Sequence, residues 1–160
     1  GPVYIRSGAA VSGTSGAIEI ATGESLDGPG GGISLQVGSS NASAGGDITL
    51  AAGASVLDGS IGGAVNIVSG AGKSSGGAVN VQGGGVTDSL TGVGGAVNIQ
   101  GGASATGGDV LLESGSSFSK SSGSVAIRSG DSYGSEKSGG ILIVSGTTES
   151  SGSGDLVVSS

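Results

Sequence analysis

The chain contains no cysteine, histidine, methionine or tryptophan, and its aromatic residues are two tyrosines and one phenylalanine. Without cysteine and histidine, the usual nucleophile–base pairs of covalent catalysis are excluded. Paired carboxylates can hydrolyse glycosides, but the acidic residues here are scattered and the aromatic residues that stack on sugars are scarce. We therefore expect no enzymatic activity. The absence of cysteine leaves the redox compartment undetermined.

The chain is also poor in positive charge, with 5 basic against 12 acidic residues and a net charge of −7. Nucleic acid and anionic membrane surfaces are bound through basic patches, so this balance argues against both partners. No apolar run approaches the length of about 18 residues that a transmembrane helix needs. We expect neither a nucleic-acid partner nor membrane insertion.

The chain is rich in glycine, with 39 residues of 160, and it repeats one short phrase eleven times. The phrase opens with glycine, carries aliphatic residues at its third and fifth positions, and continues with small residues, as in Gly63–Gly70. The opening glycines are Gly1, Gly16, Gly31, Gly46, Gly63, Gly77, Gly95, Gly108, Gly123, Gly139 and Gly154. The aliphatic pairs are Val3/Ile5, Ile18/Ile20, Ile33/Leu35, Ile48/Leu50, Val65/Ile67, Val79/Val81, Val97/Ile99, Val110/Leu112, Val125/Ile127, Ile141/Ile143 and Leu156/Val158.

Aliphatic residues two positions apart share one face of an extended strand, whereas on a helix they would point in different directions. A disordered Gly/Ser linker would not place 22 aliphatic residues in this register. The pattern therefore predicts an all-β fold, a parallel β-solenoid of eleven short strands whose aliphatic side chains meet in one dry interior. Residues 3–160 are expected to form a single repeat domain cut from a longer array, and Gly1-Pro2 resembles the remnant of an expression tag.

The length of one coil is open on the sequence alone. Alternation of longer and shorter loops, and burial of odd strands against even ones, favour two phrases or about 31 residues per coil. A coil of about 15 residues would instead stack Asn66, Asn80 and Asn98 as a polar ladder. An antiparallel β-meander would show the same alternation of loops, although its loops would be long for hairpins.

Two kinds of candidate site lie in the loops. Asp27, Asp58 and Asp88 recur at steps of 31 and 30 residues, so coils of the favoured length would align their carboxylates. Aligned carboxylates need solvent, protonation or a cation, and calcium takes oxygen ligands. We favour solvated turn aspartates, with a calcium site at these three residues as the alternative. Asn41-Ala42-Ser43 is an N-glycosylation acceptor if the chain is secreted by a eukaryote.

Two stretches, Gly45–Gly53 and Gly107–Leu112, resemble the repeats of filamentous-haemagglutinin-type bacterial adhesins. The chain is also similar to Gly/Ser-rich repeat arrays in surface proteins of algae and oomycetes. The adhesin repeats form right-handed parallel β-helices with longer coils, so the resemblance implies an elongated, extracellular, structural or adhesive role. It carries over no functional residue.

These observations together predict a structural or adhesive repeat module, a stiff rod or spacer on a cell surface, appendage or filament. Its expected partners are further copies of the repeat, within the parent chain or between chains, and also glycans or a surface. The alternative is a ligand-binding sheet for ice or polysaccharide. That reading needs a regular outward array, and the outward positions, among them Glu19, Thr49, Asn66 and Leu111, are irregular.

Overall fold

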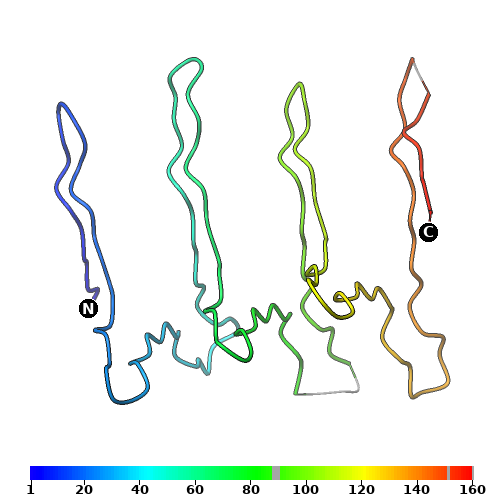
Figure 1. Cartoon of the computed structure of the whole chain (residues 1–160), viewed down its shortest axis with the longest axis horizontal. Helices are drawn as coiled ribbons and strands as arrows, with labels where there is room; N and C mark the ends of the chain where they lie inside the picture. Colours follow the sequence, from blue (N-terminus) through cyan, green and yellow to red (C-terminus); the bar gives the residue numbers. More distant parts are fainter. Residues whose placement is uncertain (88–90, 151, 160) are drawn as a thin grey trace. The chain divides into compact units, whose positions relative to one another are not determined.

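The computed structural model describes residues 1–87, 91–150 and 152–159 (Figure 1). Across these residues the backbone forms no helix and no β-strand, and it consists of extended segments joined by bends. The chain divides into two units, Gly1–Val79 and Asn80–Ser160, and each is considered by itself.

The bends fall between the phrases. In the described residues they lie at 11–13, 26–28, 41–44, 57–59, 73–74, 87, 91, 104–106, 118–120, 134–136 and 149–150. Two of them contain a glycine with a positive φ, 79° at Gly13 and 73° at Gly59. Side chains other than glycine rarely adopt this conformation, so glycine lets the chain reverse at these two bends.

The prediction of an all-β, parallel β-solenoid is wrong for this chain. The described residues contain no strand, which also removes the antiparallel meander and the β-helix that the adhesin resemblance implied. The physical reason is the pattern of backbone hydrogen bonds. Every backbone hydrogen bond in the described part closes a local loop, and none joins the extended segments of two phrases. Without such ladders, extended segments do not make a sheet.

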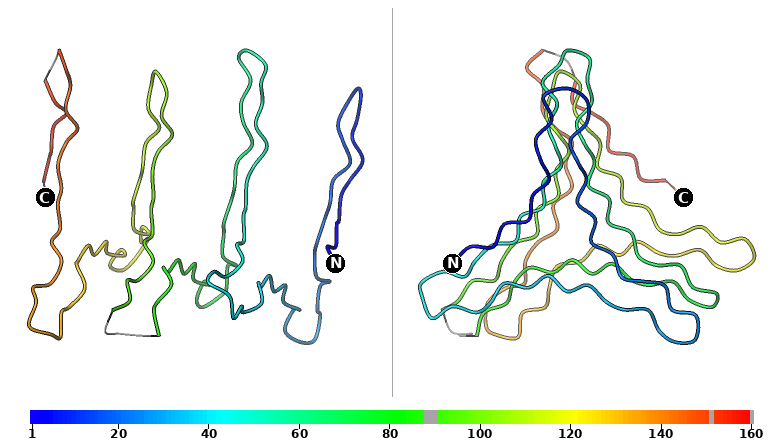
Figure 2. Two further views of the ribbon diagram at one scale, coloured as in Figure 1. Left: turned by 180° about the vertical axis from the view of Figure 1, so that it is seen from behind. Right: turned by 90° about the vertical axis from the view of Figure 1, so that its left-hand side faces the viewer.

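The two coil lengths considered from the sequence are also not observed. Viewed along the unit Gly1–Val79, the bend at 57–59 lies at the same corner of the path as the bend at 11–13. The bend at 73–74 likewise lies at the same corner as the bend at 26–28 (Figure 2). The path of this unit therefore repeats after three phrases, whereas the sequence analysis favoured two phrases and considered one.

The predicted dry interior is absent as well. No hydrophobic side chain is buried in the described part of the chain, and the 22 aliphatic residues of the phrases are all exposed. In every pair except Val3/Ile5 the side chain at the third position is the less exposed, for example 55% at Val65 against 66% at Ile67. The aliphatic residues thus share a register along the phrase, but no part of the chain that the structure describes buries them.

Candidate functional site

The most regular structure in the chain is the closure of its loops. The eighth position of the first ten phrases is a closing glycine, and at five of these positions the amide of the next opening glycine donates a hydrogen bond to its carbonyl oxygen. We call this pair of glycines a neck. The bonds run from Gly63 to Gly53, Gly77 to Gly70, Gly95 to Gly84, Gly108 to Gly102, and Gly123 to Gly115, at 2.8–2.9 Å.

Neck geometry does not depend on the length of the loop. The loop between Gly102 and Gly108 has five residues, and the loop between Gly53 and Gly63 has nine, yet their hydrogen bonds measure 2.8 and 2.9 Å. The neck is therefore a property of the two glycines and their neighbours, and the loop beyond it varies freely.

In most phrases the residue at the seventh position lies close to the next opening glycine. A Cβ built on Gly77 would lie 3.4 Å from Cβ of Ser69, and one on Gly123 would lie 3.2 Å from Cβ of Ser114. Gly83, Gly101, Ser114, Ser129 and Ser145 are half-buried, all occupy the seventh position, and every other described residue is exposed. The least exposed residues of the described part of the chain therefore lie at the seventh position, which is mostly small but holds a valine at Val37.

Hydroxyl groups reinforce some necks. The side chains of Thr22, Ser69 and Ser114, all at the seventh position, donate to the carbonyl oxygens of the next opening glycines, Gly31, Gly77 and Gly123. The distances are 3.2, 3.0 and 3.1 Å. Gly77 and Gly123 belong to necks. The three glycines follow one another at intervals of 46 residues, or three phrases, so these hydroxyl bonds repeat with the period seen in the path of the unit Gly1–Val79.

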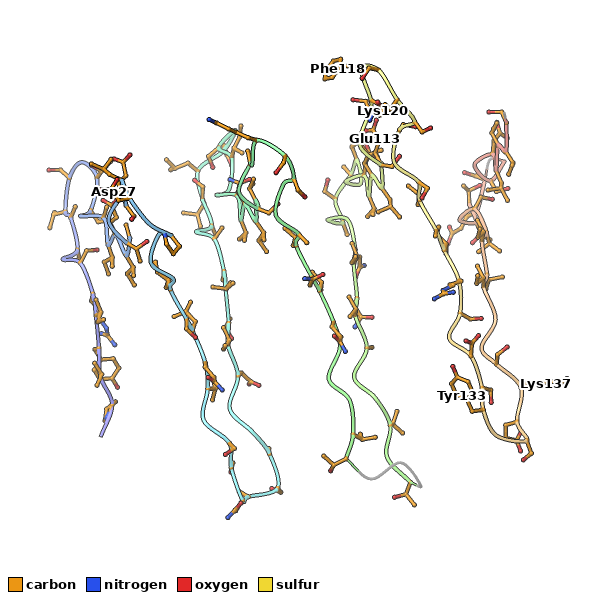
Figure 3. The ribbon with its side chains drawn as sticks, turned by 60° about the horizontal axis from the view of Figure 1, so that its bottom comes forward. Asp27, Glu113, Phe118, Lys120, Tyr133 and Lys137 are labelled. Atoms are coloured by element: carbon orange, nitrogen blue, oxygen red, sulfur yellow. The ribbon has the colours of Figure 1, made fainter. Side chains whose placement is uncertain are left out.

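Serine residues also shape the bends. The Oγ atom of Ser104 accepts from the amide of Thr106 at 3.2 Å, and that of Ser117 accepts from the amide of Lys120 at 2.9 Å. Such local bonds replace the backbone pairing of a regular turn. They leave larger side chains at the loops open to solvent, as Figure 3 shows for Phe118 and Tyr133, which are fully exposed.

The predicted calcium site is only partly covered by the structure. Asp27 lies in the bend at 26–28 and Asp58 in the bend at 57–59, while Asp88 lies outside the described residues. No group of three or more aspartate or glutamate residues gathers in the described ranges. The calcium alternative stays a prediction.

Asn41, the candidate glycosylation site, lies in the bend at 41–44 and is exposed. The amide of Ala42 donates to Oγ of Ser40 at 3.0 Å, so the acceptor tripeptide is part of a serine-stabilised bend. Nothing in the structure tests whether it is modified.

Features of other functional classes are not seen in the described part of the chain. Residues 1–87, 91–150 and 152–159 form no pocket. They contain no helix with the length and apolar character needed to cross a membrane. No family model matches the chain, and no curated protein and no solved structure matches it.

The sequence analysis missed the neck. Its signal was present, because the eighth position is glycine in every one of the first ten phrases. Those residues are Gly8, Gly23, Gly38, Gly53, Gly70, Gly84, Gly102, Gly115, Gly130 and Gly146. The glycines between the phrases were expected to form the corners of a turning chain, although a glycine that recurs at one position of every phrase also permits a close backbone contact.

Proposed function

We propose that the chain is a non-catalytic structural repeat module that functions by associating with further copies of the repeat, outside the cell or on a cell surface. The observation that carries the proposal is the exposed area of the chain, 15746 Å². A folded monomer of 14.5 kDa exposes about 6,900 Å², and a fully extended chain about 21,000 Å².

The chain therefore exposes more than twice the surface that a self-contained domain of its mass exposes. Much of the excess is aliphatic, since Val65, Ile67 and their counterparts in the other phrases are about half to two-thirds exposed or more. Burial of apolar area is the main favourable contribution to folding and association. A chain with eleven equivalent apolar pairs and no buried core among its described residues gains that contribution by association.

The extracellular part of the proposal rests on the resemblance to surface repeats noted in the sequence. Loops rich in glycine and serine, and the lack of histidine and cysteine, are compatible with that resemblance. Antibody labelling of intact and permeabilised cells that express the parent protein tests it. Labelling confined to permeabilised cells would contradict a surface location.

Self-association is tested by sedimentation velocity over a wide range of protein concentrations. We expect a concentration-dependent shift from monomer to larger species. In a triple variant, Val65→Thr, Val79→Thr and Val97→Thr, the concentration for half-association should rise about tenfold, because a hydroxyl replaces a methyl group on each apolar face. The control is Val68→Thr, at a sixth position that is 86% exposed and off the aliphatic register. A chain that stays monomeric throughout would contradict the proposal.

A further inference from the structure

The second to sixth positions of the phrases have unpaired backbones. In the described residues, none of their amide or carbonyl groups takes part in a hydrogen bond within the chain, because the backbone bonds lie at the necks and at the turn from Leu57 to Ser60. Extended segments with unpaired N–H and C=O groups are templates for pairing with another chain. Each phrase therefore presents two free backbone edges of about five residues, or about 16 Å.

The side chains of these segments alternate between two faces. In the first phrase the guanidinium carbon of Arg6 lies 4.5 Å from the ring centroid of Tyr4, which places the fourth and sixth positions together. Val3 and Ile5 occupy the intervening positions, and successive residues of an extended segment point to opposite faces. A paired segment with the same register would set its own aliphatic residues beside Val3 and Ile5.

The necks bound the segments that can pair. The first, seventh and eighth positions are occupied by contacts such as Gly77 with Ser69 and Gly70, and by the neck hydrogen bonds. A partner segment can therefore lie along the second to sixth positions only. The chain itself supplies eleven segments of this length and pattern.

The uncovered area identifies the partner as another copy. The excess over a folded monomer is about 8,800 Å², taken from 15746 Å² and the 6,900 Å² expected for this mass. A partner protein in a standard interface covers only about 800 Å² of each surface. Only a partner that engages many phrases at once covers an excess of this size, and a second copy offers the same phrase at matching intervals.

We infer that copies of this chain associate by backbone pairing, with the second to sixth positions of a phrase in one copy hydrogen-bonded to the same positions of a phrase in another. The inference rests on the proposed function, and it names the atoms that form the contact. Pairing occurs between chains, and thus differs from the single-chain solenoid that the structure excludes. The necks and bends stay outside the paired region.

Hydrogen exchange of the unmodified chain tests the pairing directly. We expect amides of the second to sixth positions to exchange at least about tenfold more slowly in concentrated than in dilute samples, since each gains a hydrogen-bond acceptor. Amides in the bends at 104–106 and 118–120 should exchange equally fast in both.

A proline series gives an independent test, because proline removes the amide donor. The triple variant Asn66→Pro, Asn80→Pro and Asn98→Pro should raise the half-association concentration by about tenfold or more. Alanine at the same three positions keeps the amide and should change it little. Ala105→Pro, in a bend, is the control for proline itself.

The outcomes separate the two proposals. Slow exchange in the phrases, together with a loss of association specific to proline, supports backbone pairing. Association with unprotected phrase amides, or equal effects of proline and alanine, overturns backbone pairing and leaves the structural role in place. A chain that stays monomeric at every concentration overturns both.

Discussion

The amide nitrogen of Gly63 donates a 2.9 Å hydrogen bond to the carbonyl oxygen of Gly53, across a loop of nine residues. The same bond, between an opening and a closing glycine, recurs at four other places where the loops have different lengths. The hydrogen bond between the two glycines is thus more constant along the chain than the number of residues in the loop between them.

The seventh position should not accept a methyl group where glycine now stands. A Cβ on Gly101 would meet the carbonyl oxygen of Gly108, whereas a Cβ on Gly102 would meet nothing within 4 Å. We expect Gly101→Ala to weaken the bond from Gly108 to Gly102 by about 1–3 kcal/mol, as overpacked sites do. Faster exchange of the Gly108 amide, measured by NMR, reports this loss. Gly102→Ala is the matched control, and equal effects of both variants would contradict the packing described for the neck.

The hydroxyl of Ser69 should stabilise the neck that it braces. Ser69→Ala removes the 3.0 Å bond to the carbonyl oxygen of Gly77 but leaves the neck bond from Gly77 to Gly70 in place. Because the hydroxyl is open to water, we expect a small effect, about two- to fivefold faster exchange of the Gly77 amide. Ser12→Ala is the control, since Ser12 makes no hydrogen bond in the described part of the chain. No change in Ser69→Ala would show that the hydroxyl is dispensable.

The bend at 57–59 should depend on its left-handed glycine. Gly59 has a φ of 73°, and a Cβ there would meet nothing within 4 Å, so the cost of substitution comes from the backbone alone. Gly59→Ala should destabilise the turn by about 1–2 kcal/mol, and Gly59→Asn by less. The readout is exchange of the Ser60 amide, which donates to the carbonyl oxygen of Leu57 at 3.1 Å. Gly45→Ala, at a glycine with an ordinary φ and open space, should have no effect on this amide.

Association between copies should strengthen with salt. Each copy carries a net charge of −7, so approaching copies repel one another. Raising the ionic strength from about 0.02 M to about 0.5 M shortens the range of that repulsion several-fold. We expect the half-association concentration to fall over this range in sedimentation experiments. A rise with salt would indicate that attraction between opposite charges, rather than apolar burial, holds the copies together.

The repeat could be read from the sequence, but the fold built on it could not. Pairs such as Val65 and Ile67 correctly place an extended segment, because their spacing is a local property of the chain. Pairing of those segments into a sheet depends on which segments become neighbours, and no local pattern encodes that. The prediction of a solenoid assumed that segments of one chain pair with each other, and the described residues show no such pairing.

The neck, in contrast, is a local feature whose glycines are visible in the sequence but whose hydrogen bond was not predicted. Gly70 and Gly77 were visible as members of two glycine series, yet a bond between them became apparent only from their backbone geometry. The three-phrase interval was hidden for a different reason. Steps of 13 to 18 residues between opening glycines obscure an interval of 46 residues unless the hydroxyls of Thr22, Ser69 and Ser114 are compared.

Loops that differ in length are closed by the same kind of hydrogen bond, from an opening to a closing glycine, as at Gly102/Gly108 and Gly84/Gly95. Peptides of foreign sequence inserted between two such anchors would be held at both ends by the chain's own glycines. Necks of this kind would let each bend diversify without altering its attachment.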